Sequence, residues 1–498
     1  MLDYLGTIFT GYNILMMNIG MTFGIIIGAL PGLSVLLAVT ILLPFTFGMD
    51  SLSGMYLLLG AYCGGTYGGS ITAILINTPG TPNAVCTTLD GYPLAKQGRG
   101  GDALETALVG STVGGMISCL ALLFAAPAIA SYALSFGAPE YFALCVFGMV
   151  IVVCLIGNSL RKGGIMACLG LLLSTVGIDS ISATSRFMFG SPHLLAGIQT
   201  VSLMLGVFAV AEILNTCALE NNASVANALD FQKAEVGFFS LLKYWKSMLR
   251  SAIIGIFIGA VPGTGGAIAA FISYSLAKKG SKEADRFGKG SLEGIIAPET
   301  ANNGVTGATL IPLLTLGIPG DACMAVLYGA LIMQGITPGP SLFTQDQYWV
   351  YCIMIGLFAI NFFMLLQGHY LCKAFAHVTK VPFSILFPCI MMFCLLGSYA
   401  IRNITFDVYT MLLFGIVGFF LKRCDYSIPP LAIGLVLGQL TENNLRRSLS
   451  LSGGSLSIFV ERPIALVVLC ISAVILIVKI ARSRKKTPIA ETVLPADD

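Results

Sequence analysis

Long apolar runs, separated by short polar stretches, follow one another along almost the whole chain. A helix needs about 20 predominantly apolar residues to cross the hydrocarbon core of a bilayer. Some runs are shorter, which favours half-helices or re-entrant hairpins at those places. The pattern predicts an all-α polytopic membrane protein with about twelve transmembrane helices. The apolar segments lie near 12–30, 33–48, 52–77, 104–130, 139–157, 164–178, 195–218, 249–277, 295–318, 321–335, 349–372, 382–400, 405–421, 428–440 and 464–481.

Two apolar runs end in a polar interruption that contains Pro-Gly. The first is NTPGTP at residues 77–82, and the second is TLGIPGD at residues 315–321. Proline removes a backbone donor and glycine weakens a helix, so both interruptions predict a broken helix. Unpaired backbone groups at membrane depth are tolerated only where they line a polar cavity or are buried in protein. A simple proline kink is the alternative explanation for either one.

The landmarks around these interruptions occur twice, in the same order. GALPGLS at 28–34 matches GAVPGTGG at 259–266, and each precedes one of the Pro-Gly interruptions. LDGYPLAKQG and LYGALIMQG then follow the two interruptions. The order predicts two structural repeats, the first in residues 1–240 with connecting helices and the second in residues 241–481. A competing alignment pairs YPLAKQG with YSLAKKG, but it breaks the order.

The charges of the loops predict that the two repeats have opposite directions in the membrane. Cytoplasmic loops are enriched in Lys and Arg. The loop around Asp50 has neither residue and the loop after the first interruption has Lys96 and Arg99. In the second half the basic loop, KKGSKEADRFGKG, comes before the interruption, and the loop after it has no Lys or Arg. We expect inverted repeats and a cytoplasmic tail at 482–498, which begins with RSRKK.

Composition agrees with this class of protein. Hydrophobic residues make up 56% of the 498 residues, charged residues make up 10%, and the mean hydropathy is +0.88. A soluble domain carries about 25% charged residues. The 14 cysteines contain no CxxC pair and lie mostly in apolar runs, so we interpret them as buried thiols rather than metal ligands. The N-terminus lacks the basic region of a cleaved signal peptide.

Inverted repeats with broken helices are typical of secondary transporters. The N–H end of a half-helix attracts anions, and a carbonyl end can coordinate a cation. The two interruptions therefore predict two halves of one binding site. They contain no Lys, Arg or His, so an anionic substrate would be held by amides, hydroxyls and helix ends. The candidate substrate-binding residues are Asn77, Thr78, Pro79, Gly80, Thr81, Thr315, Gly317, Pro319 and Gly320.

Acidic and neutral oxygen ligands near the interruptions are candidates for binding a cation. Intramembrane acids are costly and therefore functional candidates by default. Asparagines could instead join helices by hydrogen bonds, glycines could serve helix packing, and Asp321 could be a helix N-cap. The ion-binding candidates are Gly65, Thr66, Glu299, Asn302, Asn303 and Asp321. Glu212 could face a partner subunit.

Four motifs together resemble the large permease subunit of the bacterial tripartite tricarboxylate transporters. They are GALPG, GGTYGGSITAILINTPGTP, LDGYPLAKQGRGG and APETANNG with the later TLGIPGD. The resemblance implies a multi-pass protein of the bacterial inner membrane that imports citrate or related carboxylates. It further implies a small four-helix membrane subunit, a periplasmic solute-binding protein and a gradient of Na⁺, or alternatively H⁺, as the driving force. No other cofactor and no nucleic-acid partner are expected.

Other function classes fit the sequence less well. GKGS at 288–291 does not satisfy the phosphate-binding pattern GxxxxGK[ST], which argues against a primary pump. The HExxH and GxSxG patterns are absent, so we do not expect an enzyme. An ion or small-solute channel could use the same polar breaks and remains the alternative. Paired breaks in inverted repeats favour alternating access over a channel.

Overall fold

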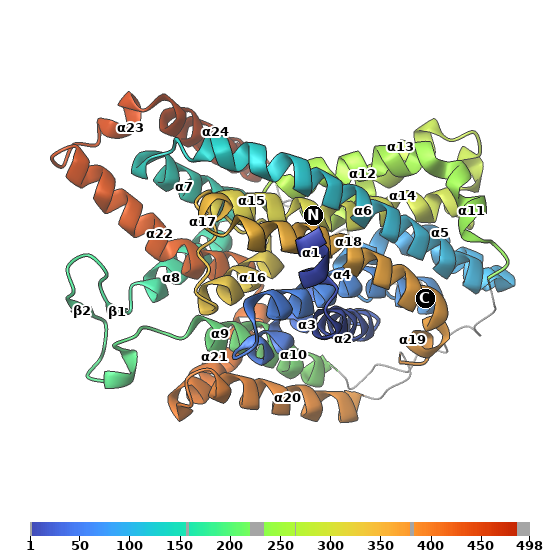
Figure 1. The fold of residues 1–498 in the computed structure, drawn as a ribbon, viewed down its shortest axis with the longest axis horizontal. Helices are drawn as coiled ribbons and strands as arrows, with labels where there is room; N and C mark the ends of the chain where they lie inside the picture. Colours follow the sequence, from blue (N-terminus) through green and yellow to red (C-terminus); the bar gives the residue numbers. More distant parts are fainter. Residues whose placement is uncertain (1, 156–158, 220–233, 264, 379–382, 486–498) are drawn as a thin grey trace, which may run out of the picture.

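The computed structural model describes residues 2–155, 159–219, 234–263, 265–378 and 383–485, and these are predominantly helical. Within these ranges the only strands are β1 (Gly177–Ile178) and β2 (Ser185–Arg186), an antiparallel hairpin that Figure 1 shows outside the helical body. Seven helices of the described residues are long and apolar enough to cross a membrane. This agrees with an all-α polytopic membrane protein, and the number twelve stays a prediction. The seven segments are Gly11–Gly28, Pro82–Ala133, Ala138–Leu155, Thr200–Ala218, Gln347–Tyr370, Thr405–Arg423 and Pro463–Ala481.

In the first half of the chain, two parallel helices are joined by a shorter returning one. Helices α2 and α4 run in the same direction, because α3 carries the chain back between them. Side chains of Thr10, Ser34 and Asp50 cap the N-termini of these three helices. The elements are α1 (Leu2–Ile8), α2 (Gly11–Gly28), α3 (Val35–Leu42), η1 (Leu43–Thr46), α4 (Ser51–Ile76), η2 (Pro82–Thr87), α5 (Thr88–Leu94), η3 (Ala95–Arg99) and α6 (Gly100–Ala133).

Glycines at every fourth position bring α2 and α4 into backbone contact. A Cβ atom added at Gly20 would lie 2.0 Å from the carbonyl oxygen of Leu57. Small residues at such spacing let two membrane helices approach closely, and van der Waals packing then stabilises the pair. The two facing rows are Gly20, Gly24 and Gly28 on α2 and Gly60, Gly64 and Gly68 on α4.

The second half repeats this arrangement. Helices α12 and α14 run parallel, and an added Cβ at Gly255 would lie 2.3 Å from the Ala301 carbonyl oxygen. Helix α13 returns between them, and α14 also packs along α6 of the first half. The elements are α12 (Trp245–Ala260), α13 (Gly265–Gly280), η8 (Ala284–Arg286), α14 (Leu292–Ala308), α15 (Leu310–Leu316), α16 (Ala322–Met333), α17 (Leu342–Gln345), α18 (Gln347–Tyr370) and α19 (Cys372–Val378).

Loops of like charge come together across the two halves. The two basic loops meet where Gln97 donates a hydrogen bond of 2.8 Å to the Lys289 carbonyl oxygen. The helices that follow the two loops without Lys or Arg meet at their N-termini, where Trp349 Nε1 donates to Ser51 Oγ at 3.1 Å. The fold therefore has one basic side and one side free of Lys and Arg at these loops, as expected if the loops were sorted by a membrane.

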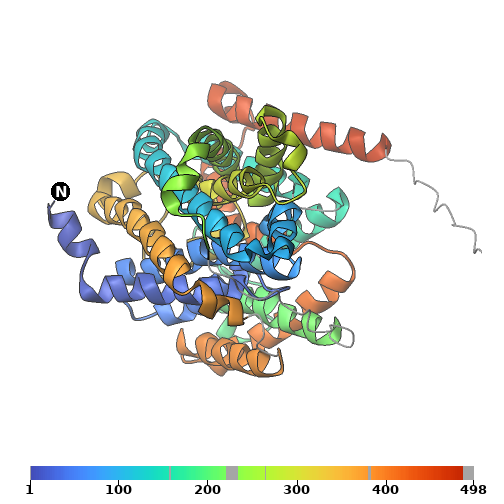
Figure 2. The same ribbon diagram turned by 90° about the vertical axis from the view of Figure 1, so that its right-hand side faces the viewer.

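The remaining helices pack around this centre. Helix α8 meets α22 through Gly170 and Gly434, and η5 meets α21 through Gly206. In Figure 2 the N-terminal end and α24 extend toward opposite edges of the view. Helix α24 includes residues 482–485 of the expected tail, and 486–498 lie outside the described residues. These elements are α7 (Ala138–Leu155), α8 (Leu160–Ser174), η4 (Pro192–Leu194), α9 (Thr200–Met204), η5 (Leu205–Val210), α10 (Ala211–Leu219), α11 (Phe238–Leu241), η7 (Leu242–Tyr244), α20 (Phe383–Ala400), α21 (Thr405–Arg423), α22 (Pro429–Leu451), α23 (Ile458–Glu461) and α24 (Pro463–Lys485).

Candidate functional site

The first break, residues 77–82, ends α4 and turns the chain back. Asn77 adopts a left-handed conformation with φ 55°, which stops the helix after Ile76. Asparagine reaches this conformation more readily than most non-glycine residues. The chain then folds back along its own helix, because the Gly80 amide donates to the Gly69 carbonyl oxygen at 3.2 Å. The predicted helix break is thus present.

The second break, residues 315–321, also ends its helix at a left-handed residue. Gly317 ends α15 in the left-handed conformation with φ 69°, and its amide donates to the Leu313 carbonyl oxygen at 3.1 Å. In both breaks the left-handed residue stands two positions before the proline. The Asp321 carboxylate caps α16 by accepting a hydrogen bond of 2.8 Å from the Met324 amide, which was the structural alternative for this residue.

Each break touches the earlier Pro-Gly turn of its own half. An added Cβ at Gly80 would lie 2.0 Å from the Gly28 carbonyl oxygen. In the second half, the Gly263 amide donates a hydrogen bond to the Gly320 carbonyl oxygen. Four interrupted helix ends are therefore grouped in two pairs, one pair in each half of the chain.

The two breaks differ in exposure. Asn77 and Thr78 of the first break are exposed, whereas residues 317–320 of the second are buried. Pro79, Gly80 and Thr81 line a cavity of about 480 Å³, which we call the Glu212 cavity. Its wall also holds the ion pair of Glu212 with Lys422. Glu212 thus has a partner within the chain, and sequence reasoning did not select this pair as part of a site.

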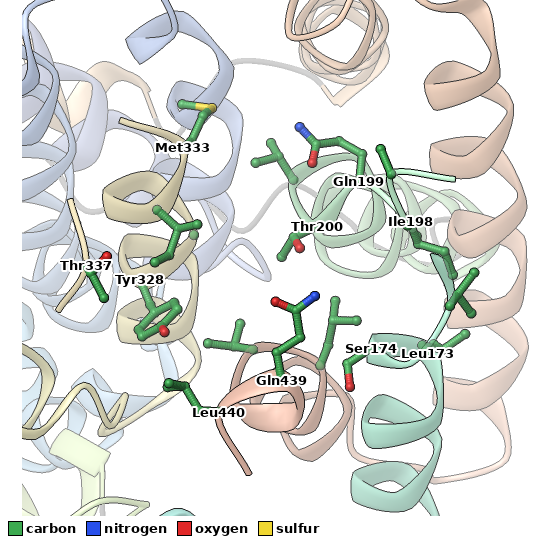
Figure 3. A pocket seen from close by; sticks show the side chains of 18 of the residues that line it. Leu173, Ser174, Ile198, Gln199, Thr200, Tyr328, Met333, Thr337, Gln439 and Leu440 are labelled. Carbon is green, nitrogen blue, oxygen red and sulfur yellow. The ribbon is translucent and has the colours of Figure 1, made fainter. Parts of the chain in front are cut away.

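A second cavity, of about 380 Å³, lies between α8, α9, α16 and α22, and we call it the Gln439 cavity. Figure 3 shows Gln199, Thr200 and Gln439 around its centre. Its polar side chains are all uncharged: Ser174, Gln199, Thr200, Tyr328, Thr337, Gln439 and Asn443. Neither of these two cavities is lined by both breaks, so the predicted substrate residues of the first and second breaks do not share either of them.

A network of charges fixes the β1–β2 hairpin beside the Gln439 cavity. Arg186 donates to both oxygens of Glu442 at 2.7 and 3.1 Å, and Arg446 donates to Asp179 at 2.6 Å. Hydrogen bonds from Ser182 and Arg446 hold the pKa of Asp179 well below its usual range. Because the two positive and two negative charges neutralise one another, we interpret this network as a structural link between the hairpin and α22 rather than as a ligand site.

The six ion-binding candidates separate into groups. Asn302 reaches the Thr66 carbonyl oxygen at 3.5 Å, so α14 and α4 meet at these two residues. The Asn303 side chain donates to the Glu299 carbonyl oxygen of its own helix at 3.3 Å. The Glu299 carboxyl instead faces Thr87 and Ser111. Gly65 packs near Val35, and Asp321 serves as the cap described above. Thr315 likewise bonds only to its own helix, at Ile311.

Asp90 is a structurally important residue that sequence reasoning missed. It is fully buried at the basic side, and its Oδ1 atom accepts three backbone hydrogen bonds, from Gly288, Gly290 and Ser291, at 2.7 to 2.9 Å. Its Oδ2 atom accepts a hydrogen bond of 2.9 Å from the Tyr274 hydroxyl. Asp90 on α5 thereby holds the basic loop of the second half. Only the phrase LDGYPLAKQG marked this position, and nothing in that phrase indicated a partner 200 residues away.

The fold and its breaks define a class: a helical membrane protein with two broken helices, matched in order and geometry, of the kind that secondary transporters use. Within that class, residues 14–433 match the tripartite tricarboxylate transporter TctA family. The chain belongs to this family, as its motifs indicated.

Two relatives from Agrobacterium vitis cover the chain to different extents. An "uncharacterized 52.8 kDa protein in TAR-I ttuC' 3'region" is 39% identical over 487 residues, 96% of this chain and 95% of the relative. An "uncharacterized protein in TAR-II ttuC' 3'region" is 40% identical over 211 residues, 42% of this chain and 87% of the relative. No solved structure matches the chain.

Proposed function

We propose that this chain is the membrane subunit of a secondary active transporter that imports citrate-like tricarboxylates or related organic carboxylates. A cation gradient, of Na⁺ or H⁺, drives the import. A periplasmic solute-binding protein delivers the substrate, and a small membrane subunit completes the complex in the bacterial inner membrane. The observation that carries the proposal is the pair of matched helix breaks, with left-handed residues at Asn77 and Gly317. The family membership supports the class of transporter.

The two halves form inverted repeats in this proposal. The meeting of the two basic loops at one side, and of the segments at the two loops without Lys or Arg at the other, supports it, because parallel repeats would mix them. Thr337, in the loop without Lys or Arg, lines the Gln439 cavity, which we place at the periplasmic side. Lys422 lines the Glu212 cavity, which we place at the cytoplasmic side together with the C-terminus. Alternating access would open these cavities in turn.

Between the Gln439 cavity and the Glu212 cavity, amides and hydroxyls would bind the carboxylates of the substrate. Gln199 and Gln439 offer amide donors at the periplasmic cavity. The first break then offers the Asn77 amide and the hydroxyls of Thr78 and Thr81, with Pro79 and Gly80 forming the adjoining cavity wall. The second break contributes Thr315, Gly317, Pro319 and Gly320 once the movement exposes them, since residues 317–320 are buried in this conformation.

The direct test is uptake of labelled citrate into vesicles that contain this chain, its small subunit and the binding protein. We expect uptake that requires an inward sodium gradient. Asn77→Ala should lower the initial rate about tenfold, because it removes the amide and strains a left-handed position. Asn77→Gly is the matched control for backbone strain, since glycine accepts this conformation and removes only the amide. Equal uptake in both variants and the wild type would contradict a substrate role for this side chain.

The same assay separates the carrier from the alternative, a channel. A carrier accumulates substrate against its concentration gradient and saturates. Uptake that only equilibrates citrate, at a rate linear in its concentration, would favour a channel that uses the same breaks. Absence of citrate uptake would move the question to the binding protein, whose pocket would have to be screened with other carboxylates.

A milder effect is expected at the periplasmic cavity. Gln439→Ala should raise the apparent KM for substrate about fivefold and leave the maximal rate unchanged, because one amide hydrogen bond contributes about 1 kcal/mol. Asn444→Ala is the matched control, since Asn444 lies on the same helix, outside the cavity lining, and its side-chain amide donates to the Leu440 carbonyl oxygen. An unchanged KM in Gln439→Ala would remove the Gln439 cavity from the route.

A further inference from the structure

The Glu299 carboxyl is completely buried where the two halves of the chain meet. It projects from α14 and accepts hydrogen bonds from two hydroxyls of the first half. One comes from Thr87 on η2, and the other comes from Ser111 on α6 at 3.0 Å. Among the described residues, no Lys, Arg or His lies within ion-pair distance of this carboxyl. A buried carboxylate without a cationic partner is strongly unfavourable unless another charge compensates it.

Two buried hydroxyls of α4 lack an ordinary hydrogen bond, and one of them faces this carboxyl. Ser70 on α4 is fully buried, and its hydroxyl faces the Glu299 carboxyl without reaching the geometry of an ordinary hydrogen bond. The Tyr67 hydroxyl, one turn earlier on the same helix, is equally buried and has no hydrogen-bond partner among the described residues. Buried polar side chains lack a partner only rarely. The Ser70 hydroxyl, facing a carboxyl that has no cationic partner, therefore indicates a ligand that oxygen atoms coordinate.

We propose that Glu299 binds a sodium ion together with the hydroxyl oxygens of Ser70, Thr87 and Ser111. A hard cation prefers carboxylate and neutral oxygen ligands, and α4, η2, α6 and α14 supply them from four directions. The positive charge of the ion and the negative charge of the Glu299 carboxylate compensate each other. Each hydroxyl can rotate to present a lone pair in place of its proton. The proposed site shares only Glu299 with the set expected from sequence: Asp321 caps α16, and the amide nitrogens of Asn302 and Asn303 donate to carbonyl oxygens while their own oxygens have no partner among the described residues.

The site is connected to the first break by a short, stiff segment. Thr87 is the last residue of η2, and η2 begins at Pro82, the last residue of the first break. A cation that draws Thr87 and Glu299 together fixes η2 and therefore the position of Pro79 and Gly80. Ion binding and substrate binding are coupled through this segment. This role in coupling rests on the proposed function, whereas the ion site itself does not.

Sodium binding is testable on the purified full-length chain in nanodiscs, without any substrate. Thermal unfolding should be measured against NaCl, with choline chloride holding the ionic strength constant and KCl as a second comparison. We expect a saturable rise in melting temperature with Na⁺ alone, as for any ligand that binds the folded state. Glu299→Gln keeps the shape of the side chain and should weaken the apparent sodium affinity at least tenfold. Ser111→Ala should weaken it several-fold.

Ser118→Ala is the matched control on the same helix. Ser118 is buried two turns after Ser111 and bonds to the Gly304 carbonyl oxygen, away from Glu299, so its variant should keep the wild-type sodium response. If Glu299→Gln does not fold, Ser111→Ala and Thr87→Val provide the same comparison. A wild-type chain that responds equally to sodium and choline, or responds only to lower pH, overturns the proposal. Sodium binding without citrate uptake would leave the site standing and contradict only the proposed substrate.

Discussion

Gly80→Ala should impair transport and markedly destabilise the fold, although it adds only one methyl group. The new Cβ atom would lie 2.0 Å from the Gly28 carbonyl oxygen and 3.0 Å from the Gly69 Cα atom. Both are backbone atoms in helices that already touch along their glycine rows, so neither can move away cheaply. We expect a loss of about 3 kcal/mol or more from overpacking, roughly a hundredfold in the ratio of folded to unfolded protein. Fluorescence-detected size exclusion after heating would measure it.

The equivalent glycine of the second break provides the control. At Gly320 an added Cβ would meet nothing closer than 3.6 Å, at Thr309, which is an ordinary contact. Gly320→Ala should therefore fold with near wild-type stability. If the two alanine variants were equally stable, the contact between the first break and the Gly28 turn would not exist as described.

Asp90→Ala should release the basic loop of the second half from α5. The substitution leaves the amides of Gly288, Gly290 and Ser291 and the Tyr274 hydroxyl without their acceptor. Each unsatisfied buried donor costs about 1–3 kcal/mol, and part of this cost returns when the loop becomes hydrated. We expect a destabilisation of about 3 kcal/mol. Hydrogen exchange should show the three amides losing roughly a hundredfold in protection.

Two variants control this prediction. Asp90→Asn retains one acceptor oxygen and should lose protection only partly. Asp285→Ala changes an exposed acid in the same basic loop and should leave exchange at the three amides unchanged. Protection that survives in Asp90→Ala would mean that the loop is held by contacts other than this carboxylate.

The sequence predicted the helical membrane class and the two breaks because both depend on local chemistry. Apolar runs require burial or lipid, and an Asn-Thr-Pro-Gly sequence strongly disfavours continuing a helix. The correspondence between GALPG and GAVPG also predicted that two halves would share an order of elements. These inferences need only residues that are close in the chain.

Sequence reasoning could not predict which side chains meet across the two halves. Glu299 was selected as an intramembrane acid, but its neighbours Thr87 and Ser111 lie 212 and 188 residues away in the chain. Asp90 was overlooked for the same reason. Gly317 and Pro319 were predicted to be the counterparts of Asn77 and Pro79 in the second half. They are buried whereas Asn77 is exposed. Exposure depends on the conformation of the whole protein, which local sequence does not determine.

The packing of α6 against α14 also constrains how the chain is made. Ser118 on α6 bonds to Gly304 on α14, which follows 186 residues later. At roughly 5–20 residues per second, the ribosome needs on the order of 10–40 seconds to deliver that partner. During this interval the newly inserted α6 presents Gly114 and Ser118 to lipid or to whatever insertion factor shelters them. A transcript that ends between the two helices would yield a membrane-inserted half that quality-control proteases should recognise.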